Sequence, residues 1–319
     1  MRPDPAFGLP PSLRGTVCTV GTFDGVHRGH QLVLERLAAR ARAHGLPAVL
    51  VTFEPHPLEV VNPAAAPPLL TLGSEKSEVL AESPIDYVVV LPFTPTLARY
   101  EAADFVDHVL IEHLGVRELL IGYDHGFGRA RSGDADVLRS LGASRGFDVA
   151  VVEAVQGSDG RPISSTTIRR AIAGGDLARA ADGLGRAYSI GGVVRQGDQR
   201  GRTIGFPTLN LGAPSPRKLL PPEGVYAVRV QTPRGTFGGM MNLGPRPTFG
   251  DPISALEVHC FEMNGELYGS RVRVDLLARL RETQKFDGPD ALRAQLAKDE
   301  SQARAVLATV AENGPPPAA

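Results

Sequence analysis

Residues 20–30 read Val-Gly-Thr-Phe-Asp-Gly-Val-His-Arg-Gly-His, and this stretch decides the fold of the first half of the chain. The apolar, β-branched run Thr16 to Val20 leads into it as a strand would, and the amphipathic run Gln31 to Ala43 follows it as a helix would. The stretch therefore lies at a strand-to-helix turn. The first N–H groups of a helix carry partial positive charge, and glycines remove the side chains that would keep an anion from them. The sequence thus predicts a phosphate-binding turn.

Two histidines, His27 and His30, end this stretch and face the same way once the helix has begun. Two imidazoles there can bracket a triphosphate and donate hydrogen bonds to the charge that develops at phosphorus. The structural alternative is a tight glycine-rich turn whose histidines only cap the helix. A zinc site that also uses His56 is a weaker alternative, because the local spacing does not specify a third ligand.

The composition excludes several classes of partner. A chain of 319 residues with 42% hydrophobic content is long enough for two cores of ordinary domain size. Its net charge of −1 argues against a general nucleic-acid or membrane-surface binder, because either needs a basic field to recruit its partner. We therefore expect two domains, no nucleic-acid partner and no membrane partner.

The sequence also suggests a location. Residues 1–14 are rich in proline and lack the apolar core of a signal peptide, and no apolar run approaches the length that spans a bilayer. Cys18 and Cys260 lie far apart in strand-like contexts, where reduced, buried thiols are expected rather than a disulfide. These features predict a cytoplasmic protein.

Strand-like and helical segments alternate over the first half of the chain. Strands are expected at 16–20, 48–53, 87–91, 119–122 and 149–153, and helices near 31–45, 75–81, 102–114 and 133–145. This order predicts an α/β domain, a parallel sheet with helices on its faces whose ligands bind beyond the carboxyl ends of the strands.

The pattern changes near residue 185. Short alternating runs punctuated by glycine and proline follow at 188–194, 224–230, 236–242, 255–261 and 271–277. This spacing favours an antiparallel barrel or sandwich, and a final helix is expected at residues 288–310.

A second anion-binding stretch, residues 163–170, reads Ile-Ser-Ser-Thr-Thr-Ile-Arg-Arg. Its consecutive hydroxyls can serve as helix N-caps, and this structural role alone would explain their presence. It does not explain Arg169, one turn into the helix. Hydroxyls, helix N–H groups and Arg169 together make an anion clamp that suits the phosphates leaving as pyrophosphate.

These two stretches resemble the Gly-x-Phe-Asp-Gly-x-His-x-Gly-His and Ile-Ser-Ser-Thr-x-Ile-Arg motifs of adenylyltransferases that make dinucleotide cofactors, in particular the FMN adenylyltransferase half of bacterial bifunctional FAD synthetases. Residues 121–128 are similar to a third loop of that family, Gly-x-Asn/Asp-Phe-x-Phe-Gly, and depart from it at His125 and Gly126.

The resemblance implies attack by the FMN phosphate on the α-phosphorus of ATP, giving FAD and pyrophosphate. The nucleophile is already ionised at neutral pH, so the site positions the reactants and neutralises charge. The implied catalytic residues are His27 and His30 at the transition state and Ser165, Thr166 and Arg169 at the leaving group. The implied nucleotide contacts are Gly21, Phe23, Asp24, Gly25 and Asp124.

A third stretch, residues 191–210, reads Gly-Gly-Val-Val-Arg-Gln-Gly-Asp-Gln-Arg-Gly-Arg-Thr-Ile-Gly-Phe-Pro-Thr-Leu-Asn. In an extended chain Thr208 and Asn210 point to one side and Leu209 to the other, so a hydroxyl and an amide oxygen can share a site. Oxygen ligands of this kind suit Mg²⁺. In the structural alternative, Gly-Phe-Pro-Thr is only a hairpin corner.

A strand-like run, residues 256–260, presents a carboxylate. It alternates so that Glu257 and His259 share the face opposite Leu256, Val258 and Cys260. A carboxylate on a rigid strand is a natural general base for an alcohol. Its alternative is a solvated residue on the outer face of the strand.

The second half resembles riboflavin kinases, whose signature Gly-x-Val-x-x-Gly-x-x-x-Gly-Arg-x-Leu/Ile-Gly-Phe-Pro-Thr-x-Asn matches residues 191–210. Residues 242–249 are similar to the Asn-x-Gly-x-x-Pro-Thr-Phe loop of that family, and residues 281–286 to its Arg-x-Glu-x-Lys-Phe, with Thr283 at the place of the glutamate. The resemblance implies that Glu257 accepts the proton of the riboflavin 5′-hydroxyl as this attacks the γ-phosphorus of ATP, with Mg²⁺ near Thr208 and Asn210. Further implied contacts are Gly197, Arg202, Gly205, Pro207, Asn242 and Arg281.

The two resemblances together imply a bifunctional enzyme. A Rossmann-like nucleotidyltransferase domain, residues 1–184, is expected before a six-stranded antiparallel Greek-key barrel with a terminal helix, residues 185–319. The enzyme would convert riboflavin to FMN and FMN to FAD, with ATP as co-substrate in both reactions and Mg²⁺ as cofactor.

Three alternatives remain at this point. The first is a kinase with weak or lost adenylyltransferase activity, and the second is a non-catalytic flavin-binding regulator. The third is a tRNA-charging enzyme, suggested by His-x-Gly-His, against which the near-zero net charge and the lack of a lysine-rich second motif argue. The sequence leaves the oligomeric state open, a homo-oligomer included.

Overall fold

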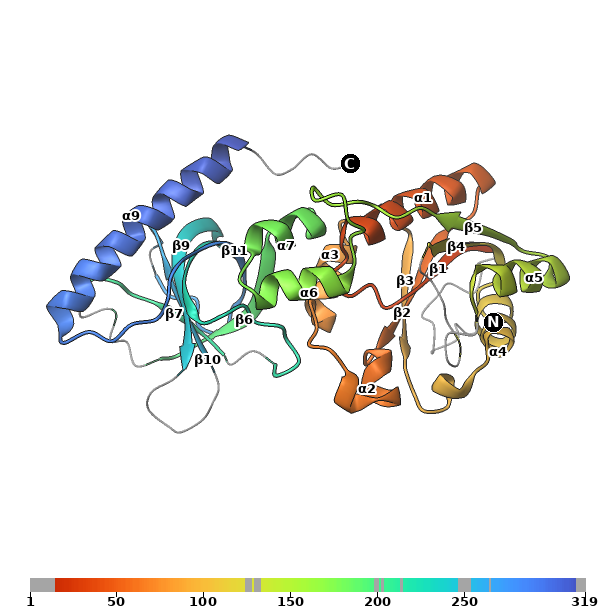
Figure 1. Ribbon diagram of the computed structural model, residues 1–319, viewed down its shortest axis with the longest axis horizontal. Helices are drawn as coiled ribbons and strands as arrows, with labels where there is room; N and C mark the ends of the chain where they lie inside the picture. Colours follow the sequence, from red (N-terminus) through yellow and green to blue (C-terminus); the bar gives the residue numbers. More distant parts are fainter. Residues whose placement is uncertain are drawn as a thin grey trace. The chain divides into compact units, whose positions relative to one another are not determined.

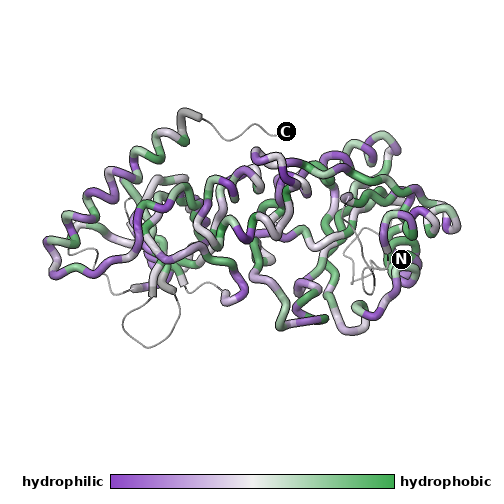
Figure 2. The backbone as a smooth tube through the Cα atoms, in the orientation of Figure 1, coloured by the Kyte–Doolittle hydropathy of each residue, from purple (hydrophilic) through white to green (hydrophobic). Residues whose placement is uncertain are grey.

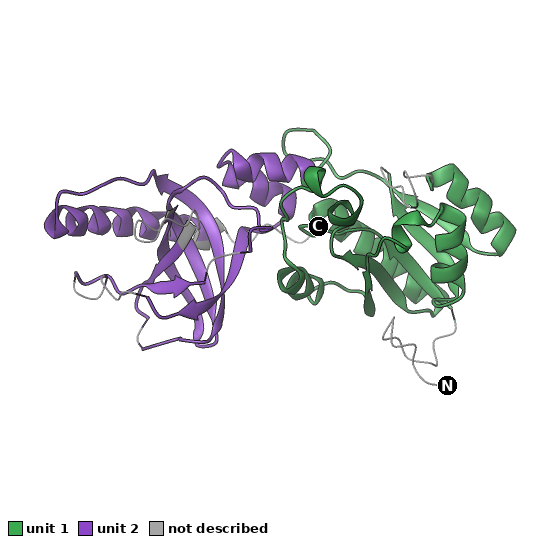
Figure 3. Ribbon diagram, turned by 90° about the horizontal axis from the view of Figure 1, so that it is seen from below, with its two compact units in different colours: residues 1–165 green, residues 166–319 purple. Residues whose placement is uncertain are grey.

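The computed structural model describes residues 15–123, 128, 133–197, 201, 204–212, 215–245, 254–263 and 265–313. The chain divides into two compact units, residues 1–165 and 166–319 (Figure 3). Each unit contains one sheet. The domain boundary expected between residues 184 and 185 stays a prediction, and the connecting helices α6 (Ser165–Ala173) and α7 (Leu177–Leu184) lie almost wholly in the second unit.

The first unit is built on a five-stranded parallel sheet, which confirms the predicted α/β arrangement (Figure 1). Its strands are β1 (Thr16–Val20), β2 (Ala48–Glu54), β3 (Tyr87–Pro92), β4 (Val116–Gly122) and β5 (Asp148–Val152), in the order β3-β2-β1-β4-β5. β1 pairs with β2 on one side and with β4 on the other, so the strand order reverses at β1. Open parallel sheets bind ligands at the carboxyl end of the strand where this reversal occurs, and residues 20–30 begin there.

Helices cover both faces of this sheet. They are α1 (Arg28–His44), α2 (Pro57–Val61), α3 (Gly73–Leu80), α4 (Ala102–Phe105), the π-helix η3 (Val106–Ile111) and α5 (Ala135–Arg145), with 3₁₀ turns η1 (Pro63–Ala65) and η2 (Leu97–Arg99). Alternate residues of β1 face different cores: Val17 packs with the α1 side, whereas Cys18 and Val20 pack with the α4 and η3 side. Every residue of β1 is buried for this reason.

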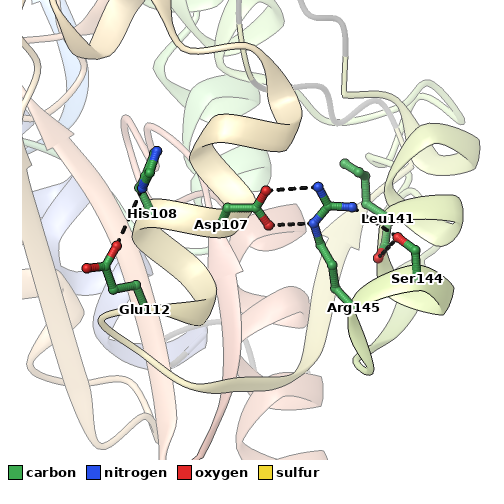
Figure 4. Close-up of polar contacts among 6 residues, drawn as sticks. All are labelled: Asp107, His108, Glu112, Leu141, Ser144 and Arg145. Carbon is green, nitrogen blue, oxygen red and sulfur yellow. Dashed lines mark hydrogen bonds and ion pairs between the residues drawn. The ribbon is translucent and has the colours of Figure 1, made fainter.

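A set of polar contacts ties α5 to η3 on the outer surface of the first unit (Figure 4). The guanidinium of Arg145 donates two hydrogen bonds to the carboxylate of Asp107, the one from Nη2 at 2.8 Å. These bonds and the positive charge lower the pKa of Asp107. His108 contacts Glu112 one turn further along, with Nδ1 and Oε2 3.4 Å apart. The cluster fastens two helices and is separate from the end of β1.

The second unit is a closed antiparallel barrel of six strands, which confirms the predicted barrel. Its strands are β6 (Tyr188–Arg195), β7 (Leu209–Leu211), β8 (Gly224–Thr232), β9 (Gly235–Pro245), β10 (Ser254–Cys260) and β11 (Arg271–Arg281), in the closed order β10-β7-β6-β11-β8-β9. Alternation predicted five of these strands. It missed β7, because three residues are too few to show a period.

The terminal helix α9 (Pro289–Asn313) packs on the barrel, as residues 288–310 predict. Hydrophilic and hydrophobic residues alternate along it (Figure 2). Its Ala303 lies in a small core with Phe261 and Met240, and Leu296 and Leu307 pack against that core. Within the described ranges, no helix combines the length and the apolar character needed to cross a membrane.

Candidate functional site

The first candidate site is the turn between β1 and α1. Phe23 and Val26 have φ values of 48° and 40°, in the left-handed region that bulky and β-branched residues rarely adopt. Gly25, with φ 84°, takes the same region without a steric penalty. Two strained side-chain-bearing residues persist in one turn only where the surrounding structure holds them.

Asp24 provides part of that support. Its buried carboxylate accepts hydrogen bonds from the N–H groups of Leu70 and Thr71, at 3.0 and 2.9 Å, and from the Thr71 hydroxyl at 3.2 Å. The same hydroxyl accepts a bond from the N–H of Gly25 at 3.0 Å. Asp24 and Gly25, predicted as nucleotide contacts, therefore shape the turn through residues 70–71. Their contact with a nucleotide stays a prediction.

The structure brings His27 and His30 together. Their rings stack with centroids 3.6 Å apart and planes at 15°, and the ring of Phe23 stacks on His30 at 4.5 Å. His27 is the N-cap of α1, and its Nδ1 accepts a hydrogen bond from the N–H of His30 at 3.3 Å. The capping role is thus present, and it coexists with two imidazoles at the positive end of a helix.

The glycines of this turn make room for the rings. A Cβ on Gly21 would lie 3.0 Å from Cε2 of Phe23, and a Cβ on Gly29 would lie 3.2 Å from the ring of His27. The sequence suggested that these glycines open the backbone to an anion. The structure adds a second reason for them, because a side chain at either position would displace an aromatic ring.

Lys76 is a residue that sequence reasoning missed. Its ammonium group lies at the carboxyl ends of β1 and β2, where it donates to the carbonyls of Thr22 and Phe53 and to the hydroxyl of Thr52, at 3.3–3.4 Å. Burial lowers the pKa of Lys76, against the opposing effect of the Glu54 and Asp24 carboxylates. The only signal in the sequence is that lysine is rare, with four in the whole chain.

Ser165 connects the second anion-binding stretch to the turn. Its hydroxyl donates to the backbone carbonyl of Asp24 at 3.0 Å. Ser165 begins α6, and Thr166 and Arg169 follow in the same helix within the second unit, the first exposed and the second half-buried. Asp124 lies outside the described residues. His56, the third histidine of the zinc alternative, caps α2 by accepting the N–H of Leu58 at 3.2 Å.

The second candidate site is a row of polar residues across three barrel strands. Asn210 of β7 lies opposite Glu257 of β10, and Glu257 lies opposite Asn242 of β9. Directly opposed residues share one face of a sheet. Leu256 and Val258 point to the other face, as the alternation predicted, and are fully buried, so the row lies on the outside of the barrel. Three predicted site residues from distant parts of the sequence are therefore neighbours.

Gly197 completes this site. A Cβ there would lie 2.3 Å from Nδ2 of Asn210, so a side chain at residue 197 would displace this buried amide. Thr208 stands half-buried just before β7, after the exposed Pro207 and after Gly205, whose φ is 87°. These predicted residues gather beside the row. Arg202 lies outside the described residues.

Arg281 has a structural partner. Its Nε and Nη2 donate to the carboxylate of Asp299 in α9, at 2.9 and 2.7 Å, and its Nη1 donates to the carbonyl of Glu282 at 2.9 Å. Asp299 is fully buried. The guanidinium thus fastens α9 to β11, and its predicted flavin contact stays a prediction.

Known proteins match both units in chain order. The model of the FAD synthetase family matches residues 9–167, and that of riboflavin kinase matches residues 184–307. The bifunctional riboflavin kinase/FMN adenylyltransferase of Escherichia coli K12 is 41% identical over 291 residues, which cover 91% of this chain and 92% of the relative. This chain belongs to the bifunctional riboflavin kinase/FMN adenylyltransferase family.

Other members agree over similar lengths. The bifunctional enzyme of Pseudomonas fluorescens is 40% identical and covers 94% of this chain and 96% of its own, and that of Bacillus subtilis is 34% identical with 90% and 91% covered. A crystal structure described as a macrolide-efflux protein from Streptococcus pneumoniae has a TM-score of 0.83 and 32% identity, and covers 93% of this chain and 95% of that one. The predicted pair of activities, riboflavin kinase and FMN adenylyltransferase, is confirmed by family membership.

Proposed function

We propose that the two reactions of this enzyme use two separate sites, one in each predicted domain. Adenylyl transfer takes place at the β1–α1 turn of residues 1–184, and phosphoryl transfer takes place at the outer row of the barrel in residues 185–319. The observation that carries this assignment is the alignment of Asn210, Glu257 and Asn242 on three adjacent strands, beside Thr208.

At the adenylyltransferase site, His27 and His30 act as donors to the phosphates of ATP. Because Nδ1 of His27 accepts the N–H of His30, neutral His27 carries its proton on Nε2 and can donate it in a hydrogen bond. The FMN phosphate needs no base, so two oriented donors at a helix N-terminus supply the kind of stabilisation that the reaction requires. Thr166, Arg169 and the N–H groups of α6 bind the leaving pyrophosphate, and Ser165 assists by joining α6 to the turn.

At the kinase site, Glu257 accepts the proton of the riboflavin 5′-hydroxyl. A carboxylate fixed on a strand between two paired strands is held in place for this transfer. Thr208 and Asn210 offer the hydroxyl and amide oxygens that Mg²⁺ prefers, and Gly197 leaves the amide space, so these residues fit the ion. Bound Mg²⁺ neutralises charge on the ATP phosphates. The product, FMN, is the substrate of the first site.

The experiment is a pair of substitutions followed by chromatography of the flavin products. Glu257→Gln should lower FMN formation by about 10²–10⁴-fold and leave FMN-to-FAD conversion intact. His30→Ala should do the reverse, and should depress adenylyltransferase turnover much more than ATP binding. Loss of both activities in Glu257→Gln would mean that this residue supports the fold instead, and unchanged turnover in His30→Ala would remove the histidine from the mechanism.

We also propose that the enzyme works in the cytoplasm. The proposal is supported by its two cysteines, Cys18 and Cys260, which are buried as free thiols, the state that a reducing compartment maintains. Burial raises the pKa of each thiol to about 12, so both stay protonated and unreactive at neutral pH.

A further inference from the structure

His259 makes a hydrogen bond that the proposed mechanism does not use. It lies on β10 two residues after Glu257 and on the same face, and its Nδ1 is 2.7 Å from the carbonyl oxygen of Pro207. A carbonyl only accepts, so Nδ1 carries the hydrogen. The distance is at the short end of the range for N–H···O bonds. The imidazole therefore binds the residue directly before Thr208.

The backbone pairing of β7 with β10 ends before that residue. The register between β7 and β10 joins Leu211, Asn210 and Leu209 to Leu256, Glu257 and Val258, and it ends there. Thr208 and Pro207 precede the paired residues, and proline has no N–H with which to extend a ladder. The bond from His259 continues the attachment to β10 past the end of the ladder, across Thr208.

The imidazole is held in a fixed plane. The ring of Phe206 lies edge-on to it with centroids 5.2 Å apart, and the ring of Phe261 does so at 5.8 Å. Phe261 is buried in the core beneath α9, and Phe206 packs against the same core. These two aromatic neighbours restrict rotation of the imidazole, so the direction of its N–H is set by packing.

We propose that His259 is a positioning residue for the metal site of the kinase. It fixes the Pro207 carbonyl and thereby the conformation in which Thr208 and Asn210 present their oxygens on one side of the chain. Mg²⁺ demands near-ideal octahedral geometry, so a small displacement of one ligand lowers its affinity. The inference rests on the metal role proposed for Thr208 and Asn210.

The test compares three replacements of His259 in the full-length enzyme. Asparagine places an amide NH₂ near the position of Nδ1, glutamine places it near Nε2, and phenylalanine keeps the ring without a donor. His259→Phe and His259→Gln should raise the Mg²⁺ concentration for half-maximal riboflavin kinase rate by about 10-fold, the lower end of the effect of residues that orient metal ligands. His259→Asn should keep it near the wild-type value.

Two further measurements separate positioning from general damage. Binding of Mn²⁺ in the presence of ADP, followed by electron paramagnetic resonance, should weaken in the Phe and Gln variants in the same proportion, without any turnover. FMN adenylyltransferase activity serves as the internal control and should not change. His108→Phe, at an exposed histidine of the first unit, is the matched control and should leave both kinase readouts unchanged.

The outcomes separate the role of His259 from the metal-ligand role proposed for Thr208 and Asn210. If Thr208→Val weakens Mn²⁺ binding and His259→Phe does not, the metal assignment stands and the role of His259 is wrong. If Thr208→Val leaves Mn²⁺ binding unchanged, the ligand role of Thr208 fails and the inference fails with it. Equal behaviour of the Asn and Gln variants, at similar thermal stability, would also overturn it, because only Asn restores a donor to Pro207.

Discussion

The ammonium group of Lys76 is largely buried, and protein groups replace only part of the water that would surround it in solution. Water is replaced by two carbonyls and a hydroxyl at 3.3–3.4 Å, distances that are long for charge-assisted hydrogen bonds. The lowered pKa of Lys76 records this loss of solvation. In return, one side chain joins the strained turn after β1 to the end of β2.

The lowered pKa predicts a pH-dependent stability. In the unfolded chain Lys76 has its ordinary pKa of 10.5, so in the interval below 10.5 and above its folded pKa the unfolded state binds more protons. The stability of the wild-type protein should therefore rise with pH across that interval, and this contribution should be lost as the pH falls through the folded pKa. Lys76→Met removes the titrating group and should remove the rise. Urea denaturation of both proteins at a series of alkaline pH values measures the difference, and parallel curves would show that Lys76 does not contribute.

Single residues also show where sequence reasoning ends. His27, His30, Asn210 and Glu257 could be predicted as site residues because their residue types and spacings are typical of phosphate and metal chemistry. The contacts of Lys76 and His259 could not be found in this way, because most of their partners are backbone carbonyls. Every residue has a backbone carbonyl, so the sequence does not show which one a side chain will bind. Only the fold brings the correct carbonyl close.

At the scale of elements, α9 is fixed to the barrel by a buried ion pair and by apolar packing. Arg281 of β11 binds Asp299 of α9 through two of its nitrogens, and the carboxylate is fully buried. The sequence predicted a final helix at residues 288–310. The ion pair could not be predicted, because charged residues of a terminal helix usually face solvent.

This pair predicts an asymmetric effect of two neighbouring substitutions. Asp299→Ala leaves the Arg281 charge in a largely buried position without its carboxylate and should lower the free energy of unfolding of the second unit by about 3 kcal/mol. Glu300→Ala removes a carboxylate that binds Arg304 on the surface and should cost less than about 1 kcal/mol. Denaturant unfolding followed by fluorescence or circular dichroism measures both, and equal losses would contradict the burial argument.

Strand β7 is the element that pattern analysis missed, although its residues belong to a recognised motif. The Gly-Phe-Pro-Thr-Leu-Asn chemistry indicated an extended chain there, but the barrel order was implied by resemblance alone. Its three residues pair with β10 on one side, and two of them, Asn210 and Leu211, pair with β6 on the other, so that β7 closes the barrel. Such pairing depends on the assembled sheet. The alternation of apolar and polar residues within one short segment does not show it.

At the scale of the whole molecule, the chain holds two compact units with one proposed site each. The change from helix-separated strands to short alternating strands predicted this division. The position of the boundary is harder to predict. Helix α6 carries residues of the motif that resembles FMN adenylyltransferases, yet it falls almost entirely in the second unit. A connecting helix of this kind gives no composition signal of where one unit ends.

Separate sites predict complementation between defective chains. The Glu257→Gln variant should retain adenylyl transfer, and the His30→Ala variant should retain riboflavin phosphorylation. An equimolar mixture supplied with riboflavin, ATP and Mg²⁺ should therefore form FAD, because FMN released by one chain can reach the other. Chromatography of the products detects it. FMN accumulation without FAD, from variants that are each active in their remaining reaction, would show that FMN does not pass between chains.

The three-residue strand β7 has a consequence for the thermodynamics of the enzyme. The segment that closes the barrel also carries Asn210, so on the roles proposed here the ion-binding group exists only when the cylinder is complete. Ligands that bind only the folded form add their binding free energy to its stability. On these proposed roles, the ion stabilises the riboflavin kinase barrel at the strand that forms the fewest backbone pairs with its neighbours.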